Sequence, residues 1–190
     1  KVGSSTGIVT GMALGSATIT YSLGSGCTIT KTITVNPVLT PIAGSSGVCV
    51  GSTTLLTDPT SGGFWSSGSP GTALIGSVSG TVSGITAGVA VISYTYAGCT
   101  TTKPITVNPL PSAFTGNVPI CILRTTTLGS TPTGGTWSSG GTGIASISSS
   151  GGVVTGIAAG TELITYTLPT TCKTTAAVTV NNPPASIAGG

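Results

Sequence analysis

Few side chains in this chain of 190 residues could take part in catalysis: there are five Cys, five Lys or Arg, two Asp or Glu, and no His. General acid–base catalysis needs His, Asp, Glu or a tuned Lys gathered in one pocket, whereas Asp58 and Glu162 lie far apart in the sequence. The abundant Ser residues have no His to activate them as nucleophiles. We therefore expect no catalytic residue, no cofactor and no enzyme activity.

The charge pattern argues against several classes of ligand. Zinc ligation by imidazole is impossible without His, no close Cys pair is present, and the carboxylates are too few for a calcium site. Basic residues scattered along the chain cannot form a phosphate-binding stripe. Every apolar run is shorter than the ~20 residues of a membrane-spanning helix. The composition predicts no metal site, no nucleic-acid partner and no membrane span.

The sequence repeats with a period of about 72 residues. Each copy has a Gly-rich stretch, a β-branched run that ends in Tyr, a Cys, and a closing Val-Asn motif. The Tyr residues are Tyr21, Tyr94 and Tyr166, the Cys residues after them are Cys27, Cys99 and Cys172, and the closing motifs are at 33–36, 105–108 and 178–181. The positions of these motifs predict where one domain ends and the next begins.

This spacing predicts four segments. Residues 1–37 form the C-terminal half of a repeat, residues 38–108 and 109–182 form complete repeats, and residues 183–190 open a further one. The last segment is assigned because Ile187-Ala188-Gly189 echoes Ile42-Ala43-Gly44. We expect these residues to be part of a longer tandem array. The alternative is that a neighbouring chain completes each half repeat.

Strand-like runs dominate each repeat, so the predicted fold class is all-β. Short β-branched runs between Gly, Pro and Ser clusters are typical of strands, and alternation of Thr with Val or Ile leaves one face of a sheet apolar. Two such sheets would pack as a β-sandwich of about 72 residues. Seven short strands are expected in the first complete repeat, near 38–43, 47–56, 63–67, 73–78, 80–85, 89–96 and 101–107.

The cysteine spacing predicts one disulfide inside each complete repeat. Cys49 precedes Cys99, and Cys121 precedes Cys172, by about 50 residues, and such a loop would stabilise a small domain by ~2–4 kcal/mol. Cys27 would then be unpaired within the window, with its partner in the missing front half of its repeat. The alternatives are an interchain bridge at Cys27, or free thiols throughout. Disulfides indicate an oxidising location, outside the cell or on its surface.

The aromatic residues that recur once per repeat are predicted to lie in the cores. Trp65 and Trp137 stand at the same place in two repeats, which favours a core position over a sugar-stacking platform. Tyr21, Tyr94 and Tyr166 recur likewise, and we expect them to be packed with their hydroxyls near a sheet edge.

Three residues that do not recur receive different predictions. Tyr96 and Phe114 are the better candidates for surface contacts. Glu162 falls in a predicted strand, at a position where we expect a solvated side chain.

The ordered motif set resembles the group 2 bacterial immunoglobulin-like domains, in particular the Cys-containing tandem versions of very large secreted proteins of Bacteroidota. The motifs are Trp-Ser-Ser at 137–139, Ser-Gly-Gly-Val-Val-Thr-Gly at 150–156, Ala-Gly-Thr-Glu-Leu-Ile-Thr-Tyr at 159–166 and Val-Thr-Val at 178–180. The resemblance implies tandem Ig-like sandwiches that serve as a stalk, adhesin or filament module without catalytic residues. The expected Cys pairing departs from that of antibody domains, and the acidic linker residues of calcium-binding arrays are missing.

Pro-rich junctions between the repeats predict a stiff rod. The junctions are Asn36-Pro37, Asn108-Pro109-Leu110-Pro111 and Asn181-Asn182-Pro183-Pro184, and Pro fixes its own φ and restricts the residue before it. A nearly neutral surface favours association. We expect a structural segment of a long extracellular fibre whose partners are neighbouring repeats or further copies. The alternatives are an adhesin or carbohydrate-binding stalk with a surface glycan as ligand, or the accessory stalk of an enzyme.

Overall fold

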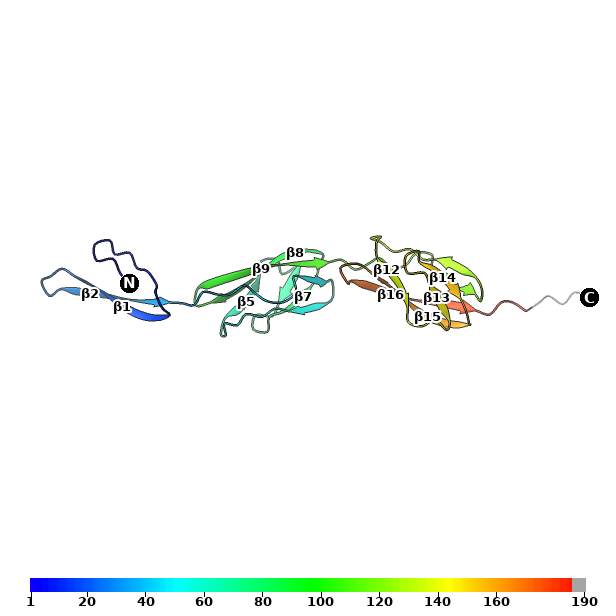
Figure 1. Ribbon diagram of the computed structural model, residues 1–190, viewed down its shortest axis with the longest axis horizontal. Helices are drawn as coiled ribbons and strands as arrows, with labels where there is room; N and C mark the ends of the chain where they lie inside the picture. The colour runs from blue at the N-terminus through cyan, green and yellow to red at the C-terminus, as the bar shows by residue number, and fades with distance from the viewer. Residues whose placement is uncertain (186–190) are drawn as a thin grey trace, which may run out of the picture.

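The computed structural model describes residues 1–185, which form strands, turns and loops without a helix. Three parts follow one another along one long axis: an N-terminal hairpin (β1–β2), a first sandwich (β3–β9) and a second sandwich (β10–β16) (Figure 1). Over these residues no helix is long and apolar enough to span a membrane. The predicted echo at 187–189 lies outside the described residues.

The N-terminal hairpin pairs β1 (Gly15–Ser22) with β2 (Thr28–Val35) in antiparallel register. No further strand joins this sheet among the described residues. The prediction that Tyr21 is packed in a core is therefore wrong, because its side chain is 65% exposed. The physical reason is that the hairpin alone supplies one layer, and a strand face is buried only when a second layer covers it.

The first sandwich contains two sheets, with strand orders β3-β9-β8-β5 and β4-β7-β6. Its strands are β3 (Gly47–Cys49), β4 (Thr53–Leu55), β5 (Phe64–Ser67), β6 (Ala73–Ile75), β7 (Thr81–Gly84), β8 (Gly88–Tyr96) and β9 (Cys99–Asn108). The predicted strand at 38–43 is absent, since only Ala43 forms an isolated bridge there. The predicted strand at 47–56 is two strands in different sheets, because the chain turns through Gly51 at φ +76°.

The second sandwich repeats this topology, with strand orders β10-β16-β15-β12 and β11-β14-β13. Its strands are β10 (Ile120–Cys121), β11 (Thr125–Thr127), β12 (Thr136–Ser139), β13 (Ala145–Ile147), β14 (Val153–Gly156), β15 (Gly160–Thr167) and β16 (Lys173–Asn181). In both sandwiches the first short strand pairs in parallel with the last strand, and the other pairs are antiparallel. That parallel pair decides where the cysteines lie.

Each sandwich has its own apolar core between its two sheets. The alternating residues of the long strands face inward, as a period of two requires. The first core is formed by Ile42, Val48, Leu56, Trp65, Ala73, Ile75, Val82, Ala90, Ile92, Tyr94, Ile105 and Val107. The second is formed by Ile120, Leu128, Trp137, Ala145, Val154, Ile164, Tyr166, Leu168, Val178 and Val180.

The two non-recurring aromatic residues expected to be candidates for surface contacts are partly buried. Tyr96 packs against the first core, and Phe114 packs against the second with its ring 4.9 Å from that of Trp137. Glu162 is also buried rather than solvated, because its Oε1 accepts hydrogen bonds from the backbone amides of Gly141 and Leu163. A buried carboxylate is tolerated where backbone donors satisfy it.

A buried tyrosine hydroxyl fastens a loop onto each sandwich. The Tyr94 hydroxyl accepts a hydrogen bond from the Gly63 amide at 2.9 Å and donates one to the Thr60 carbonyl. The second sandwich repeats the arrangement with Tyr166, Gly135 and Pro132. The polar end of the ring thus ties the loop before β5 or β12 to the long strand beneath it.

Tyr94→Phe is expected to lower the free energy of unfolding of the first sandwich by about 1–2 kcal/mol, because the Gly63 amide and the Thr60 carbonyl both lose their partner. Urea denaturation followed by Trp fluorescence would measure it. Tyr21→Phe is the matched control and should change nothing, since that hydroxyl is exposed. Equal effects of the two substitutions would contradict the assignment.

Each core Trp lies against a Gly whose backbone is in the left-handed region. A Cβ at Gly80, where φ is +69°, would lie 3.2 Å from Trp65 Nε1 and closer still to the carbonyl oxygen of Leu56. Gly152, at φ +64°, stands in the same relation to Trp137 and Leu128. Gly is required there both for its φ and for the space it leaves.

Gly80→Ala should destabilise the first sandwich by about 1–3 kcal/mol more than Gly98→Ala, because only the first substitution adds overpacking to the backbone strain. Gly98 is the matched control, since its φ is +83° but a Cβ there would meet nothing within 4 Å. Thermal unfolding of the two variants gives the comparison. Equal losses would show that strain alone accounts for the glycine.

Candidate functional site: the bridged junction

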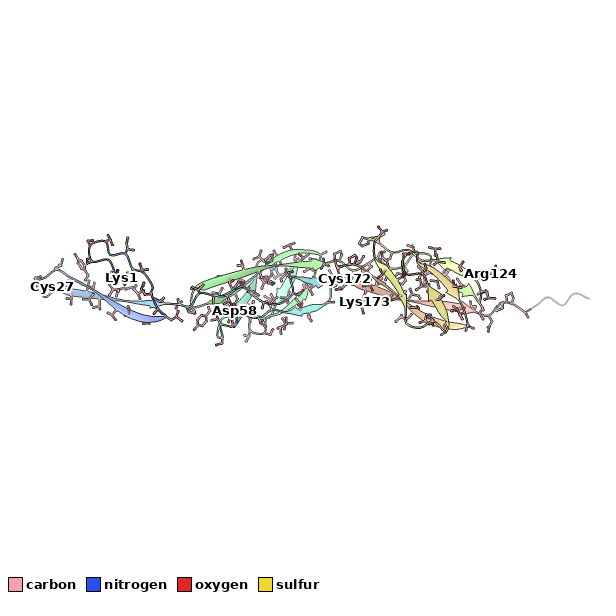
Figure 2. The ribbon with its side chains drawn as sticks, in the orientation of Figure 1. Lys1, Cys27, Asp58, Arg124, Cys172 and Lys173 are labelled. Carbon is pink, nitrogen blue, oxygen red and sulfur yellow. A yellow bond between two sulfur atoms is a disulfide. The ribbon has the colours of Figure 1, made fainter. Side chains whose placement is uncertain are left out.

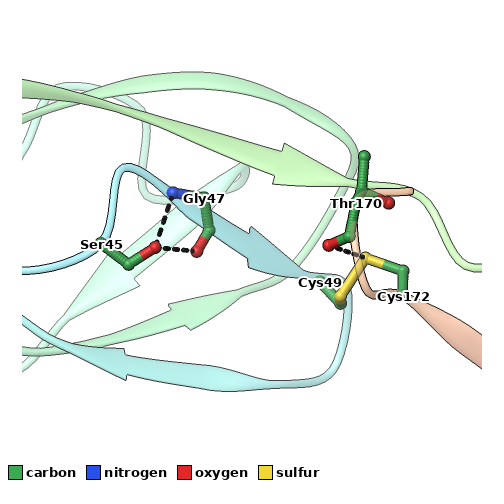
Figure 3. The surroundings of a disulfide bond; sticks show 5 residues. All are labelled: Ser45, Gly47, Cys49, Thr170 and Cys172. Atoms are coloured by element: carbon green, nitrogen blue, oxygen red, sulfur yellow. Dashed lines mark hydrogen bonds between the residues drawn. A yellow bond between two sulfur atoms is a disulfide. The ribbon is translucent and has the colours of Figure 1, made fainter. Parts of the chain in front are cut away.

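A disulfide between Cys49 and Cys172 joins the two sandwiches covalently (Figure 3). Cys49 ends β3 of the first sandwich, and Cys172 lies in the turn between β15 and β16 of the second. Their Cα atoms are 5.6 Å apart, across a sequence separation of 123 residues. We call this disulfide, with the peptide connection at 109–111, the bridged junction.

The predicted Cys49–Cys99 disulfide is wrong because the two residues lie at opposite ends of the first sandwich. The parallel pairing of β3 with β9 places Cys49 beside Asn108. Asn108 ends β9 and Cys99 begins it, so a strand of this length separates the two cysteines by about 30 Å. A disulfide requires Cα atoms within about 7 Å.

The predicted Cys121–Cys172 disulfide is wrong for the same reason. Cys121 pairs with Asn181 at the end of β16, while Cys172 directly precedes that strand. Within residues 1–185, free thiols are carried by Cys27, which is exposed, and by Cys99 and Cys121, which are partly buried. The sequence prediction did not take into account the last strand of each sandwich. The two cysteines of a sandwich lie at opposite ends of that strand.

Hydrogen bonds fix both ends of β3, the strand that ends at Cys49. The Ser45 hydroxyl donates to the Gly47 carbonyl at 2.9 Å and accepts from the Gly47 amide at 3.2 Å (Figure 3). Beyond the strand, the Val50 amide donates to the Asn108 carbonyl at 3.0 Å. Cys49 is therefore held at the end of the sandwich from which the chain leaves.

Two open grooves flank the disulfide. One, of about 530 Å³, is lined by residues that include Ser45, Cys49, Asn108, Thr170 and Thr171. The other, of about 410 Å³, is lined by residues that include Val50, Leu110, Cys172 and Lys173. Their lining combines Ser and Thr hydroxyls, the Asn108 amide, apolar side chains and the Lys173 ammonium. The disulfide lies between these two grooves, since Cys49 lines both and Cys172 lines the second.

The two acidic side chains serve the fold. Asp58 Oδ1 accepts a hydrogen bond from the Thr60 amide at 2.8 Å and so closes the turn at Asp58-Pro59. Glu162 caps the amides described above. Within residues 1–185, His, Cys, Asp and Glu side chains form no group of three that could hold a metal ion.

Comparisons with known proteins support the fold. No protein-family model and no curated protein matches the sequence. Among solved structures, the chain is similar to invasin, a bacterial integrin-binding protein, with 17% identity and a TM-score of 0.53 over 89% of this chain. It is also similar to a C-terminal fragment of intimin, solved in complex with the intimin-binding domain of its translocated receptor, with 16% identity and a TM-score of 0.50 over 76% of this chain.

The matched regions make up 46% of the invasin structure and 65% of the intimin complex's chain. At these identities the likeness is one of fold, and the two sandwiches have the Ig-like β-sandwich fold.

Cys49→Ser should abolish the covalent link between tryptic fragments 32–124 and 125–173, because it removes the partner of Cys172. These fragments arise from cleavage after Lys31, Arg124 and Lys173 of the denatured chain; Lys103 is followed by Pro104 and resists trypsin. Mass spectrometry without reductant detects the linked pair.

Cys99→Ser and Cys121→Ser are the matched controls and should both leave the link intact. If Cys121→Ser loses the link and Cys49→Ser retains it, Cys172 is bonded to Cys121 within the second sandwich and not to Cys49.

Proposed function

We propose that this chain is a non-enzymatic, load-bearing segment of a long extracellular fibre, and the observation that carries the proposal is the bridged junction. A single peptide connection between two sandwiches permits swivel and bend. The Cys49–Cys172 bond adds a second attachment beside the first, and two attachments restrict rotation about the connecting chain.

The disulfide also shortens the covalent path along which tension would pass. Force applied at the two ends of the chain would run through β3 to Cys49, cross the sulfur atoms to Cys172, and leave through β16. The residues between the two cysteines, which form most of both cores, lie outside this path. Even if those residues unfolded, the fibre would lengthen little.

The remaining observations support a surface or extracellular location. A disulfide persists in an oxidising compartment, and the similar structures, invasin and intimin, include a bacterial integrin-binding protein and a receptor-bound fragment. We place the chain in the same setting, with neighbouring sandwiches of its own kind as its partners. The long strands of the hairpin leave two eight-residue edges for lateral pairing.

An adhesin or carbohydrate-binding stalk is the alternative function. The aromatic residues expected to be candidates for surface contacts, Tyr96 and Phe114, are partly buried and packed against the cores. The exposed aromatic side chain of the first sandwich is Phe64, at 56%, and Thr136 stands in its place in the second. A stacking platform that recurs along the described residues is not formed, so we favour the structural role.

Single-molecule stretching between the two ends tests the load-bearing role. The oxidised chain should gain about 430 Å less contour length on complete unfolding than the reduced chain, because the 123-residue loop closed by the disulfide cannot extend. Cys49→Ser should match the reduced chain under both conditions, and Cys99→Ser should match the wild type. An oxidised chain that extends as far as the reduced one would refute the proposal.

A further inference from the structure

We propose that the bridged junction is one rung of a disulfide ladder, and that Cys121 forms the next rung with the turn cysteine of a further copy of the repeat. In solution a second copy of this chain can supply that turn through Cys27. This inference rests on the proposed structural function and deepens it, because it names the partner, a copy of the same chain, and the bond that joins them.

Cys121 occupies the same backbone site as the bonded Cys49. After Cys49, the Val50 amide bonds the last residue of β9, the Gly51 amide bonds Gly84, and the Ser52 amide bonds the Cys49 carbonyl. After Cys121, the same three bonds run from Ile122, Leu123 and Arg124 to Asn181, Gly156 and Cys121. Both cysteines end a strand paired in parallel with the last strand. A site that holds a disulfide in one sandwich is thus built again in the other.

Cys27 likewise occupies the same kind of turn as the bonded Cys172. In each case a Leu directly follows the first strand, three residues separate it from the Cys, and the Cys directly precedes the second strand. The Leu23 amide donates to the Cys27 carbonyl at 3.3 Å, and the Leu168 amide donates to the Cys172 carbonyl at 2.9 Å. The Cys27 side chain is exposed, so its thiol is accessible to a second molecule.

The two thiols lie at opposite ends of the molecule. Cys27 is at the tip of the N-terminal hairpin, and Arg124, whose amide bonds Cys121, is at the far end of the second sandwich (Figure 2). They are therefore too far apart to bond within one chain. Bonds between chains would join head to tail, which produces an open, linear polymer.

Cys99 is not the expected partner of a second copy. Its turn has two residues, Ala97 and Gly98, in place of three. The Asn36 side chain donates to the Ala97 carbonyl at 2.6 Å, so the link from the hairpin already lies against this turn. Cys99 thus serves as the matched control for Cys27.

The bond can form by thiol–disulfide exchange with a small disulfide such as oxidised glutathione. The Cys27 thiolate attacks one glutathione sulfur and becomes a mixed disulfide, releasing one glutathione thiolate. The Cys121 thiolate of the next chain then attacks the Cys27 sulfur, and the second glutathione thiolate leaves. Two protein thiols are oxidised and one glutathione disulfide is reduced to two thiols, so electrons and protons balance.

Oxidation of the purified chain with a glutathione redox buffer tests the ladder. The wild type should form oligomers of three or more chains that reductant disperses, and mass spectrometry should find Cys121 linked to Cys27 in excess over symmetric Cys121–Cys121 links. Cys27→Ser and Cys121→Ser should each lose the oligomers beyond dimer, and Cys99→Ser should retain them.

Retention of the Cys49–Cys172 link and of the β-sheet circular dichroism verifies that each variant is folded. Absence of oligomers in the wild type, their persistence in Cys121→Ser, or a majority of symmetric links would overturn the ladder. These results would leave the stretching behaviour of the single chain untouched, so the ladder can fail while the proposed function stands. If the oxidised chain instead extends as far as the reduced chain in the stretching test, the proposed function itself fails.

Discussion

The parallel pairing of a three-residue strand with the last strand of its sandwich is the constraint on which the rest of this structure depends. Because β3 runs alongside the end of β9, Cys49 is carried to the end of the sandwich from which the chain leaves. Three residues of backbone pairing thus decide that the disulfide joins two sandwiches.

The sandwiches are held together mainly by apolar side chains buried between their sheets. Their cores combine β-branched side chains with one Trp and one Tyr each, and the Tyr hydroxyl satisfies backbone groups of a loop that would otherwise be left without a partner. Domains of this size have little core to spare. The disulfide lies outside both core clusters and links one sandwich to the other.

The all-β class and the buried positions of Trp65 and Trp137 could be predicted, because alternation and recurrence along the sequence indicate them. Tyr94 and Tyr166 recur and are buried, yet Tyr21 recurs and is exposed, since burial requires a second layer that a motif does not supply. Phe114 shows the converse: it does not recur, yet it packs on Trp137. Glu162 was misassigned because the amides that bind it belong to a distant loop as well as to its own strand.

By itself the sequence determined the all-β class, the period of the repeats and the scarcity of catalytic side chains, because composition and local alternation suffice for these. Only the tertiary structure decided which cysteines meet. Spacing along the chain suggested partners about 50 residues apart, but a ten-residue strand separates Cys99 from Cys49. A disulfide forms only between cysteines that are close in space. Strand direction sets that distance, and neither composition nor period encodes strand direction.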